Sequence, residues 1–271
     1  MNKPFLAGIL FFLFILNLKA AENYPAGARS RALSNAFVSV SDTWNTFHNQ
    51  AGLAELESFS AGFFYESRFM VDELSFAATS VVIPVKAGNF GLSFSQFGKG
   101  TYKEHKAGLA FSKRLTKNFN AAVQLDYLSQ QYPENENAAG FITFEFGVVY
   151  AATEDLFFGA HIFNPIQGGI RTPEGLQKMP AIFRIGGHYQ FPKMVLLILE
   201  TEKDTQHPFV IKSGIEFSPV KNLALRFGVS GKPVNYTAGI GYQIGKITTD
   251  IGFGYHGNLG LTPSVSIQIN L

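Results

Sequence analysis

The sequence predicts an all-β protein, a transmembrane antiparallel β-barrel of about 14 strands with a short N-terminal plug segment. From residue 58 to 271 it consists of short segments in which apolar and polar residues alternate. In 236–245 every second residue is apolar, and Thr, Gly and Gln lie between. Successive side chains of a strand point to opposite faces, so each segment has one apolar face and one polar face of small residues. An apolar face toward lipid and a crowded polar interior are typical of a membrane barrel.

Composition supports this fold class. The chain has 28 Phe and 27 Gly among 271 residues, only 15% charged residues, no Cys and a net charge of +2. Helical membrane proteins need apolar runs of about 20 residues, and none follows the N-terminal region. The lack of cysteine excludes disulfides and thiolate metal sites. The small net charge, without a basic stripe, gives no indication of nucleic-acid binding.

Residues 1–21 are predicted to be a cleaved signal peptide. Lys3 precedes an apolar run, Phe5–Leu18, and small residues close the segment at Ala20 and Ala21. The run is too short to span a bilayer comfortably and has the layout of an export signal. Together with a barrel pattern, it predicts the outer membrane of a Gram-negative bacterium.

Residues 22–57 do not alternate and are predicted to form the plug. Within them, 29–40 is expected to be either a short helix or a docked coil, because Leu33, Phe37 and Val40 have helical spacing. Residues 58–271 form the barrel. A 14-stranded barrel leaves more room than its own side chains fill, and the preceding segment is the candidate to occupy it.

The predicted strands follow one another with short turns. Tight turns alternate with longer connections, so the long ones, 133–137 and 164–179, fall together at the outer end, and both termini are expected at the periplasmic end. The predicted ranges are 58–68, 72–83, 88–97, 103–113, 118–132, 138–152, 155–163, 180–191, 193–202, 207–218, 221–230, 234–245, 247–257 and 260–271.

The N-terminal motifs resemble those of a known family. Residues 27–42 (Gly-Ala-Arg-Ser-Arg-Ala-Leu-Ser-Asn-Ala-Phe-Val-Ser-Val-Ser-Asp), followed by 49–54 (Asn-Gln-Ala-Gly-Leu-Ala), resemble the signature of FadL-like outer-membrane barrels, closest to the PorV/PorQ branch of Bacteroidota. Gln50 stands where many members have Pro. The hairpin at 255–263 is also similar. The resemblance implies either a channel for hydrophobic substrates with a plugged lumen and a lateral opening, or a subunit that acts with large partners in type IX secretion.

Inward polar positions carry both signs of charge. Buried charges must be paired, so we expect an ion-pair network that joins strands and plug. A charged selectivity lining is the alternative. Arg29 and Arg31 are expected to pair with Glu145 and Glu216, or else to bind an acidic headgroup. The predicted plug and lumen contacts are Arg29, Arg31, Phe37, Asp42, Asn49, Glu145, Arg184 and Glu216.

The loop at 164–179 is the most distinctive connection. It contains two Pro and three Gly, which predicts a shaped loop. Long loops on rigid scaffolds often carry binding, so Asn164, Pro165, Arg171 and Pro173 are candidate partner contacts. The alternative is a loop that folds over its own barrel mouth.

No enzyme chemistry is predicted. The six His lack metal-ligand spacing, Ser264 and His256 lack a nucleophile elbow, and no cofactor motif is present. The outer loops and the chain are short, which favours a partner-docking or accessory subunit of an outer-membrane protein machine. The alternative is a FadL-like channel for small hydrophobic molecules. Expected partners are outer-membrane lipid and a larger outer-membrane protein, with a hydrophobic ligand in the lumen under the alternative.

Overall fold

The computed structural model describes residues 23–100, 102–132, 135–172, 175–192, 194–231 and 233–271. The predicted signal peptide, residues 1–21, lies outside them. The helical elements are α1 (Ala28–Ala32), η1 (Thr43–Phe47), η2 (Gln50–Glu55), η3 (Arg68–Met70) and η4 (Asp72–Leu74). The strands are β1 (Ser60–Ser67), β2 (Ser75–Val85), β3 (Gly88–Phe97), β4 (Lys103–Thr116), β5 (Phe119–Tyr132), β6 (Asn135–Ala151), β7 (Leu156–Phe163), β8 (Gly169–Thr172), β9 (Gly175–Lys178), β10 (Ile182–Phe191), β11 (Val195–Asp204), β12 (Val210–Val220), β13 (Leu223–Ser230), β14 (Asn235–Ile244), β15 (Ile247–His256) and β16 (Gly260–Asn270).

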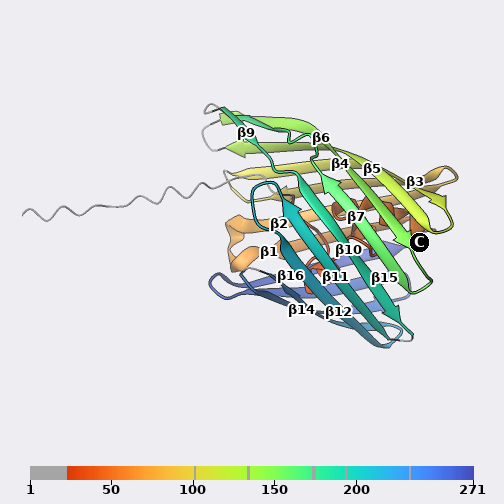
Figure 1. The fold of residues 1–271 in the computed structure, drawn as a ribbon. Helices are drawn as coiled ribbons and strands as arrows, with labels where there is room; N and C mark the ends of the chain where they lie inside the picture. The colour runs from red at the N-terminus through yellow and green to blue at the C-terminus, as the bar shows by residue number, and fades with distance from the viewer. Residues whose placement is uncertain (1–22, 101, 133–134, 173–174, 193, 232) are drawn as a thin grey trace, which may run out of the picture.

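Fourteen strands form one closed antiparallel barrel (Figure 1). Each pairs with its neighbour along the chain, β7 pairs with β10, and β1 closes the ring against β16 from Ser60↔Asn270 to Glu66↔Ser264. The remaining two strands, β8 and β9, form a separate hairpin. The predicted fold class is confirmed, and each predicted strand boundary lies within three residues of the observed one.

The two ends of the barrel differ as predicted, with tight turns at one end and the longer connections at the other. At the turn end, where β1 begins and β16 ends, the connections are two to four residues long. The loop end carries the longest connections, 68–74 with η3 and η4, and 164–181 with β8 and β9. Residues 133–137 were expected to form a long loop, and this is wrong. The β5–β6 ladder continues to Tyr132↔Asn135, which leaves only two residues between the strands.

The wall has the inside-out pattern expected of a membrane barrel. The outward side chains of Ile240 and Tyr242 are 42% and 51% exposed, whereas the inward Thr237 and Asp250 are 2% and 1% exposed. Charged side chains of both signs on the inward face are buried, among them Glu66, Lys106, Asp126, Glu145, Arg184, Lys212, Glu216, Arg226 and Asp250. The apolar face therefore meets the bilayer, and the polar face meets the lumen.

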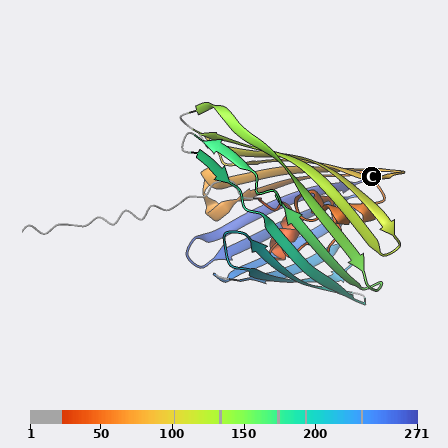
Figure 2. The ribbon, with the colours of Figure 1, turned by 45° about the horizontal axis from the view of Figure 1, so that its top comes forward.

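The segment before β1 lies inside the barrel, where Figure 2 shows its helical turns in red and orange. The ring of Tyr24 stacks on Phe97 at the loop end of β3, with 4.6 Å between ring centroids. At its other end the segment enters β1 at the turn end. It therefore traverses the lumen, and the described N-terminus lies at the loop end, opposite to the expected periplasmic position. We call residues 23–57 the plug.

The plug has little regular structure. The helix α1 has only five residues, because Ser34 and Asn35 adopt left-handed backbone conformations with φ of 56° and 57°. The apolar residues with helical spacing, Leu33, Phe37 and Val40, therefore lie in a docked coil instead of on one helix. They pack against the inner side of β11. Among the described residues, no helix is long and apolar enough to cross a membrane.

Candidate functional site: the plugged lumen and its vestibule

Glycines of the wall allow the plug to approach closely. An added Cβ at Gly228 would lie 2.7 Å from the backbone nitrogen of Ser34, and one at Gly252 would lie 2.8 Å from the carbonyl oxygen of Ala28. Both distances are shorter than an ordinary van der Waals contact. The small residues on the inward face thus reflect crowding by the plug. Glycines that meet the plug in this way lie on nine strands around the barrel: Gly62, Gly91, Gly147, Gly159, Gly186, Gly214, Gly228, Gly239, Gly252 and Gly254.

Side-chain amides satisfy the irregular backbone of the plug. Asp42 and Asn45 form a capping box at the start of η1. The amide of Asn45 also donates to the carbonyl oxygens of Val40 (2.8 Å) and Asn49 (2.9 Å). The amide of Asn49 donates to the carbonyl oxygen of Val148 on β6 (3.0 Å). Buried backbone groups without such partners cost free energy, so these residues fix the coil in one conformation.

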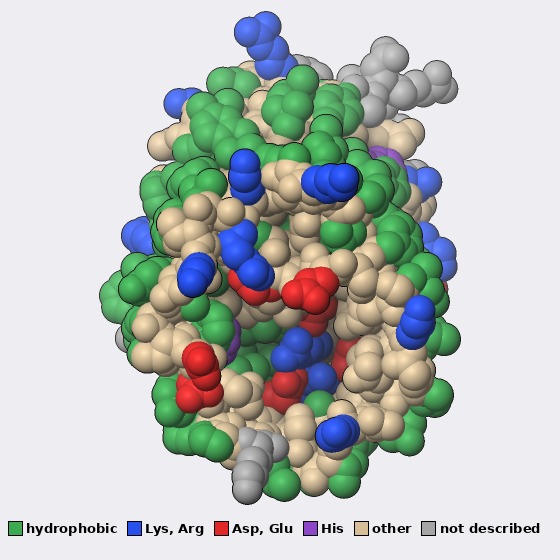
Figure 3. Space-filling view, turned by 90° about the vertical axis from the view of Figure 1, so that its right-hand side faces the viewer, with side chains coloured by type: hydrophobic (Ala, Val, Ile, Leu, Met, Phe, Trp, Pro, Cys, Tyr) green, Lys and Arg blue, Asp and Glu red, His purple; other side chains and the backbone are tan. Residues whose placement is uncertain are grey.

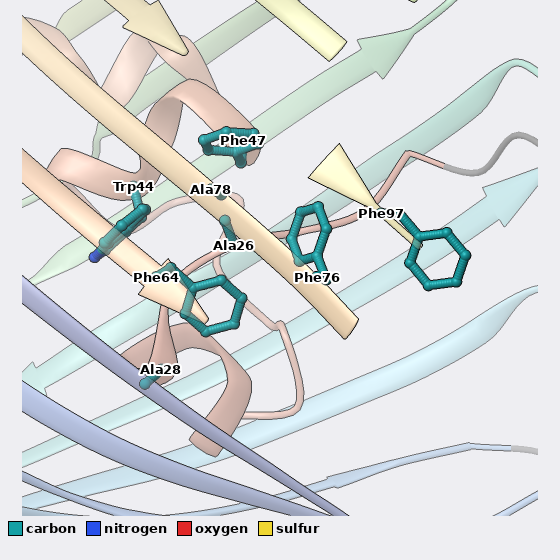
Figure 4. Packing of buried hydrophobic residues seen from close by; sticks show 8 residues of the cluster. All are labelled: Ala26, Ala28, Trp44, Phe47, Phe64, Phe76, Ala78 and Phe97. Atoms are coloured by element: carbon teal, nitrogen blue, oxygen red, sulfur yellow. The ribbon is translucent and has the colours of Figure 1, made fainter. Parts of the chain in front are cut away.

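A cluster of aromatic rings anchors the plug to β1 and β2 (Figure 4). Trp44 of η1 packs edge-on against Phe64, and Phe64 packs edge-on against Phe76, each at 5.9 Å between centroids. Trp44 and Phe76 are fully buried. Edge-to-face aromatic pairs contribute about 0.5–1.5 kcal/mol beyond their burial. Phe64 of the wall therefore packs against the plug.

One ion-pair network joins the plug to the wall at the turn end. The guanidinium of Arg29 donates twice to Glu216 (2.9 and 2.8 Å) and once to Asp42 (3.0 Å). Arg226 extends the network by donating to Glu216 (2.5 Å) and Asp250 (2.7 Å). Viewed from the turn end, the barrel is hollowed, and acidic and basic side chains lie inside the hollow (Figure 3).

A second network is buried beside η2. The ammonium group of Lys106 contacts Glu145 and lies 3.6 Å from a carboxylate oxygen of Asp126. Glu145 also accepts a hydrogen bond from the amide of Gln50 (2.8 Å) and is hydrogen-bonded to the imidazole of His161 (2.8 Å). Gln50, the residue that departs from the family pattern, therefore holds the plug to β6.

A third network fixes the middle of the plug to β10 and β11. The carboxylate of Glu200 accepts hydrogen bonds from the backbone N–H groups of Phe37 (2.7 Å) and Val38 (2.8 Å). Arg184 donates to Glu200 (2.7 Å) and to the carbonyl oxygen of Asn35 (2.9 Å). Charge-assisted hydrogen bonds of this kind are about twice as strong as neutral ones.

The two arginines of α1 reach different strands. Arg29 binds Glu216, whereas Arg31 lies 3.0 Å from Glu66 on β1 and contacts neither Glu145 nor Glu216. Residues two apart on a helix point in different directions, which explains why a single carboxylate cluster does not hold both. Glu145 is occupied by the second network.

Two adjoining cavities, together called the vestibule, lie between the plug and the loop end of the barrel. Their volumes are about 230 and 220 Å³, and both are lined by Pro25, Asn35 and Arg68. The charged side chains in their lining are four basic and two acidic ones: Arg31, Arg68, Arg184, Lys212, Glu66 and Glu202. The rings of Tyr24, Phe47, Phe69 and Phe163 complete the aromatic part of the lining.

Arg68 is central to the vestibule, and sequence reasoning missed it. Its guanidinium lies over the ring of Tyr24, 4.3 Å from the centroid, and over that of Phe97 at 5.2 Å. It also donates to Glu66 (2.8 Å). The following residue, Phe69, has a left-handed backbone conformation with a φ of 54°, so the chain leaves the β1 strand at this point. The available signal was the inward Glu66 two residues before Arg68.

The loop at 164–179 is partly built into the mouth of the barrel. Asn164 is fully buried, and its side chain accepts a hydrogen bond from Thr143 (2.8 Å). Pro165 is half-buried, Arg171 is exposed, and Pro173 lies outside the described residues. Asn164 thus holds the base of the loop, and of the four candidate partner contacts Arg171 is the one shown to be exposed.

No cluster of three or more His, Cys, Asp or Glu side chains able to hold a metal ion occurs within the described parts of the chain. The buried carboxylates described above are occupied by Arg, Lys, His and amide donors. The arrangement is that of a structural polar interior, and the vestibule is the unfilled space within it at the loop end.

Comparison with known proteins places the chain by fold. The Pseudomonas putida toluene transporter TodX superposes with a TM-score of 0.69 over 92% of this chain and 99% of its own, at 14% sequence identity. A Pseudomonas aeruginosa FadL homologue gives a TM-score of 0.66 over 90% and 98%, at 12% identity. The Acinetobacter baumannii outer membrane protein Omp33 gives 0.51 over 80% and 100%, at 7% identity.

No family model matches the sequence, and no curated protein is similar to it. The superpositions show that the chain has the FadL-like barrel fold of outer-membrane proteins. Its assignment to the PorV/PorQ branch stays a prediction.

Proposed function

We propose that this protein is a non-enzymatic outer-membrane channel for small hydrophobic or amphipathic molecules, with the vestibule as the first site that such a molecule meets. The observation that carries the proposal is the vestibule itself, a cavity at the loop end with aromatic rings and a basic excess in its lining. The fold of a barrel described as a toluene transporter supports it. This was the alternative interpretation of the sequence, and the structural neighbours favour it over partner docking.

The size of the vestibule sets the size of the ligand. An apolar cavity of about 150 Å³ holds benzene, so the larger cavity, of about 230 Å³, accommodates a molecule with one aromatic ring. Four basic side chains face two acidic ones in the lining. Opposite charges attract over these distances, so benzoate should bind more tightly than toluene.

Calorimetric titration of the purified protein with benzoate and with toluene tests the site. Ile182 lines the vestibule, whereas its neighbour Phe183 points to the bilayer and is 49% exposed. The Ile182→Trp variant should reduce the affinity for both compounds at least tenfold by filling the cavity. The Phe183→Trp control should bind like the wild type. Equal binding by both variants would place the ligand elsewhere.

Passage of a ligand requires the plug to be the barrier. Removing residues 27–50 deletes α1, η1 and the contacts of Arg29 with Glu216. We expect the shortened protein to show a higher ion conductance in planar bilayers than the full chain. Gly228→Ala, which leaves the chain length unchanged, should raise the frequency of brief openings. An unchanged conductance in both variants would contradict the role of the plug.

Partner docking is a second candidate, and one observation favours it. Ile166 and Leu176 in the 164–179 loop are 58% and 56% exposed at the loop end, outside the apolar wall. Exposed apolar groups of this kind often mark protein contacts. Docking predicts stoichiometric co-purification with a larger membrane protein in mild detergent, lost in an Ile166→Ser/Leu176→Ser variant. Recovery of a lone barrel from both proteins argues for the channel alone.

A further inference from the structure

A large groove, separate from the vestibule, lies on the outer surface of the barrel. It has a volume of about 890 Å³ and crosses β7, β10, β11, β12 and β13. Its lining comes from these strands alone, without any residue of the plug. Exposed apolar side chains such as Ile185, Leu199 and Phe227, at 64%, 60% and 50% exposure, form its sides. We call this concavity the wall groove; it faces the bilayer.

Small outward residues create the wall groove. On β10, Gly187 stands between the outward Ile185 and Tyr189, and on β12, Ser213 stands between the outward Ile211 and Ile215. Side chains two apart on a strand share a face, so each small residue leaves a gap in a row of large ones. The groove is thus a local feature of the sequence of β10 and β12.

A basic side chain stands at the loop end of the wall groove. The outward face of β11 runs through Leu197, Leu199 and Thr201, which line the groove, to Lys203. Each step of two residues along a strand covers about 6.8 Å. The ammonium group of Lys203 donates to the carbonyl oxygens of Asp204 (2.7 Å) and His207. Within the described ranges it forms no ion pair with a carboxylate.

We propose that the wall groove binds an anionic phospholipid, with an acyl chain in the groove and the headgroup phosphate on Lys203. The occupant must be apolar along most of its length, because the hydroxyls in the lining are those of Tyr189, Thr201 and Ser213 alone, and Ser213 already donates to the carbonyl oxygen of Val229 (3.5 Å). It must also carry a negative charge at one end to complement Lys203. The volume lies within the range of about 300–1,000 Å³ typical of ligand sites.

Other occupants fit less well. A second copy of this chain would present its own apolar wall, which offers no anion to Lys203. A transmembrane helix is about 10 Å wide and would have to place an acidic residue at the membrane boundary. A cation at one end of an apolar groove matches the layout of a phospholipid, in which one charged group joins long apolar chains.

Native mass spectrometry of the purified full-length mature protein tests the proposal. The protein is equilibrated in mixed micelles with dioleoylphosphatidylglycerol or dioleoylphosphatidylcholine. One phosphatidylglycerol should be retained per barrel, with an apparent affinity about fivefold above that for phosphatidylcholine. This ratio corresponds to about 1 kcal/mol, the typical contribution of one lysine near an anionic lipid.

Two variants separate the acyl-chain contact from the headgroup contact. Ser213→Leu fills the wall groove and should lower retention of both lipids at least tenfold. Thr79→Leu is its control, because Thr79 is also outward-facing and also donates to a neighbouring carbonyl at 3.5 Å, on the distant β2. Lys203→Met should abolish the preference for phosphatidylglycerol and leave phosphatidylcholine retention unchanged. The exposed Lys113, at the turn end of β4, supplies the matched Lys113→Met control.

Three results would overturn the proposal. Lipid retention by Ser213→Leu at the wild-type level would place the lipid outside the groove. A fivefold preference that persists in Lys203→Met would assign the headgroup to another cation. A dimer mass that disappears in Ser213→Leu would identify a second copy as the occupant.

Discussion

Replacing Gly228 with alanine should loosen the plug while leaving the outer face of the barrel unchanged. The new Cβ would lie 2.6 Å from the hydroxyl oxygen of Thr237, 2.7 Å from the backbone nitrogen of Ser34 and 2.8 Å from the carbonyl carbon of Leu33. Two of these atoms belong to the plug backbone, which cannot rotate away as a flexible side chain can. The plug must therefore move by several tenths of an ångström.

The cost follows from the contacts that this movement stretches. The hydroxyl of Thr237 accepts a hydrogen bond from the backbone N–H of Ser34 (3.1 Å) and donates to the carbonyl oxygen of Ala32 (2.9 Å). Each such bond contributes about 1 kcal/mol, and overpacking costs about 1–3 kcal/mol. Alanine also lowers the conformational entropy of the unfolded chain, which offsets about 0.4–1 kcal/mol of this loss in stability. The expected net loss in the free energy of plug docking is about 2 kcal/mol.

The only tryptophan of the chain, Trp44, reports on docking because it is fully buried between plug and wall. Its fluorescence is followed during urea titration of the folded protein in detergent micelles. At a slope of about 1 kcal/mol per molar urea, Gly228→Ala should lower the midpoint by about 2 M. Gly257→Ala is the control, because no atom lies within 4 Å of its added Cβ. Identical midpoints for the two variants would refute the close packing of the plug against β13.

Three further variants probe the polar contacts of the plug with the same fluorescence assay. Glu216→Gln leaves two guanidinium groups without their shared carboxylate and should cost about 2–3 kcal/mol. Lys106→Met removes the cation beside the buried Glu145 and should cost about 3–5 kcal/mol, against less than about 0.5 kcal/mol for the exposed Lys113→Met. Burial lowers the pKa of His48 well below its usual range, so the undocked plug takes up a proton first as the pH falls below about 6.5. Docking should therefore weaken by about 2 kcal/mol between pH 7.5 and 5, and His48→Gln should flatten this dependence.

The strands were predictable from the sequence because their signal is periodic and local. Alternation in segments such as 236–245 places one face in lipid and the other in the lumen, and a shift by one residue would reverse both. Each strand therefore had one acceptable register. The prediction of a loop at 133–137 was wrong because this alternation is absent there. Residues 135–137 belong to β6 and continue the β5–β6 ladder beyond the apolar band, where alternation no longer marks a strand.

The plug was predictable as an occupant of the lumen but not in its contacts. Its segment lacks a period, so nothing local indicated that Arg31 reaches Glu66 while Arg29 reaches Glu216. Those pairings depend on where a five-residue helix sits among fourteen strands. Arg68 was missed because its partners, the rings of Tyr24 and Phe97, are distant in sequence.

Under the proposed channel function, the distribution of charge within the lumen argues against the passage of small inorganic ions. An ion-selective pore needs side chains of one sign that are free to meet the ion. Here the inward carboxylates Glu145, Glu200 and Glu216 each bind a basic side chain, and each also binds a group of the plug. A migrating ion would have to break these pairs at a cost of several kcal/mol each. Under the proposed function, a hydrophobic or amphipathic molecule would meet the aromatic and basic surface of the vestibule before it reaches these pairs.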